Sequence, residues 1–327
     1  MKCINKIIAI LLTASVAISV WGCSNTVSVE NKYDLYEDSF AYGLTVNAPD
    51  TSSNLMGEGL CITDGSNIGM DAVDSQIASS AALFNVDTGE VLYSQNVLEQ
   101  IYPASTTKIL TAYIAIKYGD LNQEITVSEE ACKQDSDSSV CNLNPGDVLT
   151  LRQLLYGLML RSGNDAAIAI AEGISGSSEL FANRMNEEAK KLGATHSHFV
   201  TPNGLHDDEH YTTAYDMYLI FNSAIKLQDF VEILQTVSYD VYYKDINGED
   251  QQQTWANTCG YLSGNYESPD NVTVLGGKTG TTGQAKYCLV CLCKNEKNER
   301  LVSMVYHADS RGNLYYLMNE ILYQFVQ

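Results

Sequence analysis

A serine followed three residues later by a lysine could provide a nucleophile and its base. Ser105 and Lys108 have this spacing, and residues i and i+3 of a helix share a face. A serine hydroxyl becomes nucleophilic when a base takes its proton. A lysine can be that base only if burial or a nearby charge lowers its pKa. Ser223 and Lys226 show the same spacing, so this pattern alone is weak evidence for catalysis.

A second motif, Ser162-Gly163-Asn164, combines a hydroxyl that can relay a proton with an amide that can hold a substrate backbone. The motif lies in a tight turn between two expected helices. Ser-x-Asn also occurs at Ser52, Ser94 and Ser263, so this motif is weaker evidence than the first.

The third motif, Lys278-Thr279-Gly280, ends an apolar strand. Lys278 can attract a terminal carboxylate, and Thr279 can add a hydroxyl contact. Gly280 lets another backbone approach closely, and a strand edge can bind a peptide as an additional strand. No other Lys-Thr-Gly occurs in the chain.

Hydrophobic periodicity and turn residues predict the elements that must position these motifs. The order is strands, a long helical insert, strands, and a final helix. This order predicts an α/β (α+β) protein with an antiparallel sheet flanked by helices and a mostly helical inserted subdomain. Strands are expected at 81–86, 90–95, 272–280, 285–294 and 300–307, and helices at 109–116, 149–160, 165–172, 180–192, 215–225 and 314–326.

The three motifs, in this order and in these elements, resemble the penicillin-binding protein and serine β-lactamase superfamily. More narrowly, the chain resembles the low-molecular-weight serine-type D-alanyl-D-alanine carboxypeptidases (peptidase S11). The resemblance covers about residue 75 to the C-terminus and implies a β-lactamase/transpeptidase-like fold. It is carried by YPASTTK (102–108), LLYGLMLRSGNDAA (154–167), TPNGLHDDEHYTTAYDM (201–217) and KTGTTGQAKY (278–287).

The resemblance implies an acyl-enzyme mechanism on peptidoglycan stem peptides, without metal or other cofactor. Ser105 would attack the carbonyl between the two terminal D-alanines, and Lys108 would act as its base. Ser162, assisted by Lys278, would relay a proton to the leaving D-alanine. β-Lactam antibiotics would acylate Ser105 as mimics of the substrate.

The remaining groups of the implied site hold the substrate. Asn164 would bind the substrate backbone or orient Lys108, and Lys278 and Thr279 would hold the terminal carboxylate. Thr281 would provide, with Ser105, the backbone N–H groups that bind the oxyanion, beside Gly280. Some relatives have an arginine where this chain has Tyr215, and Arg161 could take over a carboxylate-binding role.

The N-terminus predicts export. Lys2 and Lys6 precede an apolar stretch at 7–20, which is too short to span a bilayer comfortably and is typical of a signal peptide. Gly22-Cys23 then resembles a lipobox. We expect a lipoprotein signal peptide at 1–22, lipidation of Cys23, and a membrane anchor on the extracytoplasmic face. The alternative is ordinary secretion with an incidental cysteine.

Residues 23–74 are acidic and polar, which predicts a flexible tether before a catalytic domain at 75–327. Aromatic residues at 33–42 leave docking onto the domain as an alternative. The whole chain has a formal net charge of −21, which argues against nucleic acid as a partner and against a basic lipid-binding patch.

Several alternatives remain open at this point. A D,D-endopeptidase acting on cross-links and a slowly turning-over β-lactam or muropeptide sensor share the same motifs. A class A β-lactamase lacks support, because no glutamate lies between 189 and 208. A zinc peptidase is disfavoured because no HExxH occurs. Cys288, Cys291 and Cys293 are interpreted as buried structural thiols, whereas a Cys132–Cys141 disulfide is left undecided.

Overall fold

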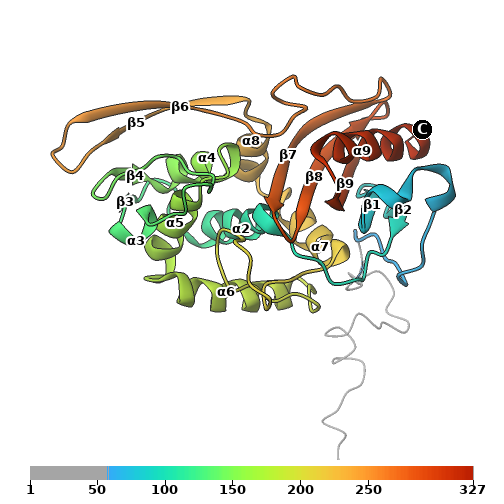
Figure 1. Cartoon of the computed structure of the whole chain (residues 1–327), viewed down its shortest axis with the longest axis horizontal. Helices are drawn as coiled ribbons and strands as arrows, with labels where there is room; N and C mark the ends of the chain where they lie inside the picture. Colours follow the sequence, from blue (N-terminus) through green and yellow to red (C-terminus); the bar gives the residue numbers. More distant parts are fainter. Residues whose placement is uncertain (1–56, 58, 327) are drawn as a thin grey trace, which may run out of the picture. The chain divides into compact units, whose positions relative to one another are not determined.

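The main sheet combines strands from both ends of the described chain (Figure 1). The computed structural model describes residue 57 and residues 59–326. Within them, an antiparallel five-stranded sheet has the order β2-β1-β9-β8-β7. The first strand of the chain, β1, therefore pairs with the last, β9, in the middle of the sheet. Its strands are β1 (Ser80–Asn85), β2 (Glu90–Gln95), β7 (Val272–Thr282), β8 (Lys286–Asn295) and β9 (Arg300–Ala308).

Between β2 and β7 the chain forms a mostly helical region, as the sequence predicts. Side-chain caps define where several helices begin. Thr150 and Gln153 form a capping box at α4, and Ser177 and Thr213 cap α6 and α7. The helices are α2 (Lys108–Tyr118), α3 (Glu129–Cys132), α4 (Leu151–Leu160), α5 (Asn164–Ser175), α6 (Ser178–Lys191), α7 (Ala214–Ala224) and α8 (Gln228–Gln235).

The sheet lies between two helical layers, because successive side chains of a strand point to opposite faces. Ala82 and Phe84 of β1 join the apolar cluster that includes α2 and α7. Ala81 and Leu83 join the cluster around the C-terminal helix, α9 (Arg311–Phe325). Burial on both faces agrees with β1 being buried along its whole length.

A second sheet, with the order β3-β4-β5-β6, was not expected from the sequence. Its strands are β3 (Glu124–Thr126), β4 (Val148–Thr150), β5 (Ser238–Lys244) and β6 (Asp250–Ala256). The first two have three residues each, which is too short for a periodic pattern. β6 contains three consecutive glutamines, so its sequence lacks the apolar alternation by which a strand is recognised.

Residues 59–74 pack onto the same compact unit as the main sheet, so the expected boundary at residue 75 is too late. The compact unit begins at Gly59. Cys61 is buried; its N–H donates to the Tyr218 hydroxyl at 2.7 Å, and its carbonyl accepts from the Tyr215 hydroxyl at 3.0 Å. These partners lie about 150 residues away in the sequence, so local composition could not reveal them. The expected signal peptide at 1–22, Cys23 and the part of the expected tether up to residue 56 lie outside the described residues.

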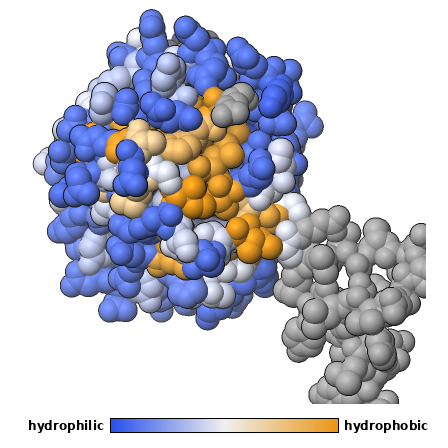
Figure 2. All heavy atoms as spheres, turned by 90° about the vertical axis from the view of Figure 1, so that its right-hand side faces the viewer, coloured by the Kyte–Doolittle hydropathy of each residue, from blue (hydrophilic) through white to orange (hydrophobic). Residues whose placement is uncertain are grey.

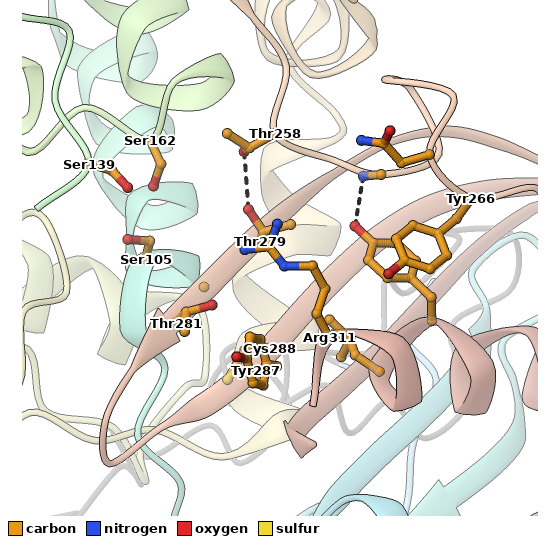
Figure 3. A pocket seen from close by; sticks show the side chains of 15 residues that line it. Ser105, Ser139, Ser162, Thr258, Tyr266, Thr279, Thr281, Tyr287, Cys288 and Arg311 are labelled. Atoms are coloured by element: carbon orange, nitrogen blue, oxygen red, sulfur yellow. Dashed lines mark hydrogen bonds between the residues drawn. The ribbon is translucent and has the colours of Figure 1, made fainter. Parts of the chain in front are cut away.

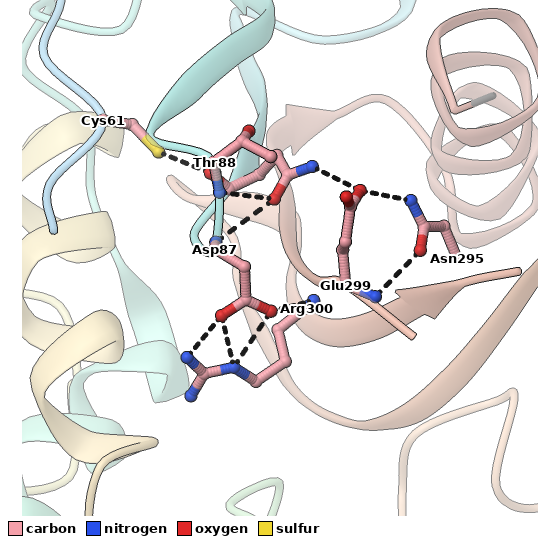
Figure 4. Close-up of polar contacts among 7 residues, drawn as sticks. Cys61, Asp87, Thr88, Asn295, Glu299 and Arg300 are labelled. Atoms are coloured by element: carbon pink, nitrogen blue, oxygen red, sulfur yellow. Dashed lines mark hydrogen bonds and ion pairs between the residues drawn. The ribbon is translucent and has the colours of Figure 1, made fainter. Parts of the chain in front are cut away.

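Polar side chains fix the end of β1 to the β8–β9 connection (Figure 4). Glu299 accepts hydrogen bonds from the side-chain amides of Asn85, at 3.0 Å, and Asn295, at 2.8 Å. Arg300 and Asp87 form an ion pair at 2.6 Å, and this hydrogen-bonded contact lowers the pKa of Asp87. The turn after β1 is therefore held in place by the neighbouring strand and the connection that precedes it.

Apolar surface gathers on the face that Figure 2 shows. Exposed apolar side chains from residues 59–77 and the segment after β2 include Ile62, Ile68 and Leu98. The backbone at Gly65 lies directly against Leu98, so the N-terminal segment contributes to this surface. No helix within residues 59–326 is both long enough and apolar enough to cross a membrane.

Candidate active site

Ser105 and Lys108 lie together at the junction of a 3₁₀ turn and a buried helix. The 3₁₀ turn spans Ala104–Thr107, and α2 begins at Lys108. Side chains at i and i+3 are eclipsed in 3₁₀ geometry, which aligns the two residues. Lys108 Nζ donates to Ser105 Oγ at 3.0 Å. The spacing in the sequence therefore becomes direct contact between an amine and a hydroxyl.

Lys108 is completely buried and is surrounded by neutral acceptors. Its Nζ also contacts Asn164 Oδ1 at 2.8 Å and the carbonyl of Asn203 at 2.7 Å. Burial and then the charge of Lys278 hold the pKa of Lys108 well below its usual range, although the carboxylate of Asp165 opposes this shift. A lowered pKa makes the neutral amine available as a proton acceptor.

Ser162 faces Lys278 from the turn between α4 and α5. Lys278 Nζ donates to Ser162 Oγ at 2.9 Å. Burial lowers the pKa of Lys278 to about 7, so this amine can gain or lose a proton near neutrality. The backbone of Ser162 has φ = 59°, a conformation that costs energy for a residue with a side chain and that clusters at functional sites.

Strand β7 brings Thr279, Gly280 and Thr281 beside Ser105 (Figure 3). Thr279 Oγ1 is 3.1 Å from Thr258 Oγ1. A Cβ at Gly280 would lie only 3.1 Å from the backbone nitrogen of Ser105, so a glycine permits this close approach. Ser105 and Thr281 line the same cavity.

Asp165 organises the wall of the cavity opposite β7. Its buried carboxylate accepts the backbone N–H groups of Cys141, at 2.9 Å, and Leu143, at 3.1 Å. The N–H of Asn164 donates to the carbonyl of Ser139 at 2.8 Å. These bonds place Ser139 in the lining of the cavity. Ser139 was not predicted as a site residue, because nothing in its polar, irregular surroundings distinguishes it in the sequence.

The cavity, with a volume of about 390 Å³, runs from Ser105 past Thr279 to a group of aromatic side chains. Arg311, in the first turn of α9, extends toward Thr279 in Figure 3. Arg161 is not among the described residues that line the cavity, so Arg311 is better placed to meet a carboxylate. Arg311 was not predicted as a site residue, because the final helix was expected to begin at residue 314, whereas α9 begins at Arg311.

The cysteines of the described residues are free thiols. Cys132 Sγ donates to the carbonyl of Leu143 at 3.2 Å, and Cys141 is buried beside Gly163, so the undecided disulfide is not formed. Burial raises the pKa of Cys288 to about 12 and raises those of Cys291 and Cys293 as well. Within residues 59–326, no group of His, Cys, Asp or Glu side chains is arranged to hold a metal ion.

A serine in contact with a buried lysine, on an antiparallel sheet covered by helices, is the arrangement typical of the penicillin-binding fold. Residues 69–310 match the family model of peptidase S11, described as D-alanyl-D-alanine carboxypeptidase. The chain therefore belongs to this family, and the family and fold predicted from its motifs are confirmed.

Individual relatives give the same result. D-alanyl-D-alanine carboxypeptidase DacF of Bacillus subtilis is 35% identical over 238 residues, which are 71% of this chain and 58% of that protein. The carboxypeptidase of Streptomyces sp. K15 is 35% identical over 217 residues, 63% of this chain and 72% of that protein. The crystal structure titled Streptomyces K15 DD-transpeptidase superimposes with a TM-score of 0.70 at 30% identity, covering 76% of this chain and 96% of that one. The match thus spans little more than half of DacF.

Proposed function

We propose that the protein is a serine-type D-alanyl-D-alanine carboxypeptidase that removes the terminal D-alanine of peptidoglycan stem peptides. The observation that carries this proposal is the 3.0 Å contact between Ser105 Oγ and the buried amine of Lys108. Family membership and the names of the relatives support the substrate class.

The reaction begins when Lys108 takes the proton of Ser105 and Oγ attacks the carbonyl carbon of the penultimate D-alanine. The backbone N–H groups of Ser105 and Thr281 bind the oxyanion that forms. Removing one donor from such a site typically costs about 10²–10³ in rate. As the C–N bond breaks, the proton held by Lys108 passes through Ser162, assisted by Lys278, to the leaving amine, which returns Lys108 to its neutral form. Water then hydrolyses the ester and regenerates the Ser105 hydroxyl.

The terminal carboxylate of the substrate binds beside Thr279. Thr279 and Arg311 both line the cavity there. The buried amine of Lys278 adds positive charge next to Thr279. An arginine suits this task because it stays charged and can bind a carboxylate with two parallel hydrogen bonds. Asn164 orients Lys108 through the 2.8 Å bond to its amine.

The test compares Ser105→Ala with Ser223→Ala. Ser105→Ala should abolish both labelling by a fluorescent penicillin and release of D-alanine from a pentapeptide. Ser223 belongs to the second Ser-x-x-Lys match, but its hydroxyl only donates to the carbonyl of Leu219 within α7. Its alanine variant should therefore retain both activities. Persistent labelling of Ser105→Ala would refute the assignment of the nucleophile.

We also propose that the protein is exported and anchored by a lipid on Cys23. The apolar stretch at 7–20 and the Gly22-Cys23 junction support this proposal. Cys23→Ser should lose metabolic labelling by palmitate and leave the membrane fraction. Equal labelling of the wild type and the variant would contradict lipidation at this residue.

A further inference from the structure

The active-site cavity continues beyond the groups that meet the substrate carboxylate. Past Thr279 and Arg311, it is lined by residues of the loop after β6 and of α9. We call this part the tyrosine subsite. It consists of Gly260, Asn265, Tyr266, Leu314 and Tyr315.

The tyrosine subsite has a fixed aromatic wall. Tyr266 and Tyr315 stack with ring centroids 3.8 Å apart and planes inclined by 10°. The Tyr315 hydroxyl accepts the N–H of Gly260 at 2.7 Å, and the N–H of Tyr266 donates to the carbonyl of the same glycine at 3.1 Å. These bonds tie the loop to α9, so the wall is formed before any ligand arrives.

A D-alanine leaving group does not need this space. It ends at a carboxylate and carries only a methyl group. The whole cavity, at about 390 Å³, falls within the range of roughly 300–1,000 Å³ that holds ligands of drug size. In the part beyond the carboxylate, the partly exposed ring of Tyr266 provides the accessible apolar surface, and Leu314 and Tyr315, each 2% exposed, back it from behind. An aromatic surface of this kind suits hydrocarbon rather than charge.

We infer that the tyrosine subsite receives the side chain of the leaving D-amino acid. The enzyme then releases D-residues with long aliphatic or aromatic side chains as well as D-alanine. In a cross-linked peptide, the leaving amine belongs to a diamino acid whose aliphatic chain leads to the second stem peptide. The bond changes are those of the carboxypeptidase reaction: water supplies the new C–O bond, and the amine departs with a proton. This inference rests on the proposed function.

The test uses two acyl-peptides that differ only at the last residue, D-Ala-D-Ala and D-Ala-D-Phe. We expect wild-type kcat/KM for the D-Phe peptide to equal or exceed that for the D-Ala peptide. Tyr266→Ala should lower kcat/KM for the D-Phe peptide about tenfold, as expected for one lost aromatic contact, and change the D-Ala value less than about twofold. Tyr266→Phe should preserve the wild-type ratio. Tyr323→Ala, on an exposed part of α9, is the matched control and should change neither value.

A second variant keeps the inference testable if Tyr266→Ala does not fold. Asn265 is exposed at the rim, so Asn265→Trp should fold, narrow the subsite and slow only the D-Phe peptide. The inference alone is overturned if wild type releases D-alanine but cleaves the D-Phe peptide more than about 100-fold more slowly, or if Tyr266→Ala slows both peptides equally. Failure of wild type to cleave either peptide would overturn the proposed function instead. Cleavage of a purified cross-linked dimer by wild type, slowed in Asn265→Trp, would extend the result to cross-links.

Discussion

Helix α2 carries a lysine at each end, and the two ends have opposite electrostatics. Lys108, in the first turn, is completely buried, and its pKa is lowered by burial and by Lys278. Lys117, in the last turn, is partly exposed and donates to Glu188 at 2.8 Å. Partial burial alone would lower its pKa, but the hydrogen bonds to Glu188 and Tyr113 and the nearby Tyr118 hydroxyl together raise it. One residue type on one helix thus yields a candidate base at one end and a permanent cation at the other.

The difference lies in the neighbouring groups. In the part of the chain that the structure describes, Lys108 Nζ has only neutral hydrogen-bond partners, a hydroxyl, an amide oxygen and a carbonyl. Glu188 is 1% exposed and accepts from Lys117, Lys191 and the hydroxyl of Tyr118. Burial would raise the pKa of Glu188, but these three bonds lower it to about 2. The proposed chemistry thus requires a buried amine without a counterion, so that the amine can be neutral, whereas stability requires the counterion.

Replacing Lys108 should produce the largest effect. Lys108→Met fills a similar volume without an amine, and we expect acylation by a β-lactam to slow by about 10²–10⁴, the usual contribution of a general base. Because burying an amine without a counterion is unfavourable, its removal offsets the three lost hydrogen bonds, and thermal stability should not fall in parallel. Stopped-flow acylation and thermal unfolding would measure the two quantities. Lys117→Met is the matched control, and it should show normal acylation with lower thermal stability. Slow acylation in both variants would remove the contrast between the two ends of the helix.

Removing the charge of Glu188 should affect stability rather than catalysis. We expect Glu188→Gln to lower the free energy of unfolding by about 2 kcal/mol at pH 7, because a buried set of charged hydrogen bonds is lost. A carboxyl group whose pKa is depressed in the folded state stabilises the fold at pH values above its ordinary pKa of 4.5. That contribution disappears as the pH falls through about 2.

Urea unfolding of wild type and Glu188→Gln at pH 7 and pH 3 would therefore show a gap that narrows on acidification. A gap that is independent of pH would show that packing, rather than the charge, is responsible. Acylation by a β-lactam at pH 7 should be unchanged in the variant.

The subtlest prediction concerns the influence of one lysine on the other. The positive charge of Lys278 helps to lower the pKa of Lys108. In Lys278→Met that charge is absent, so the pKa of Lys108 should rise and its neutral form should appear only at higher pH. The acid limb of the acylation rate against pH should move to higher pH relative to wild type. Lys278→Arg retains a positive charge and should leave the limb where it was. An unshifted limb in Lys278→Met would show that burial alone sets the pKa of Lys108.

The sequence predicted well those parts of the fold and site that local patterns encode. β2 has the predicted bounds, and the helices from α4 to α7 agree to within three residues. The spacing of Ser105 and Lys108 also sufficed to predict their contact, because a single turn brings the two side chains together. The polar hairpin β5–β6 was missed because pairing across the hairpin, rather than an apolar stripe, defines it.

Contacts between distant segments could not be predicted in this way. Arg311 reaches the cavity only because α9 lies over β8 and β9. Cys61 is held by two tyrosines of α7 that its own neighbourhood does not specify. Both depend on tertiary packing, which a single sequence does not reveal by periodicity.

The packing of residues 59–74 has a practical consequence for recombinant work. An expression clone that starts at residue 75 would remove the backbone bridge between Ile68 and Ser94. It would also remove Cys61, whose backbone groups are hydrogen-bond partners of the Tyr215 and Tyr218 hydroxyls. Each polar group left buried without a partner costs about 1–3 kcal/mol, and the uncovered β2 edge would invite aggregation. Truncations for crystallisation or inhibitor screening should therefore begin no later than residue 57.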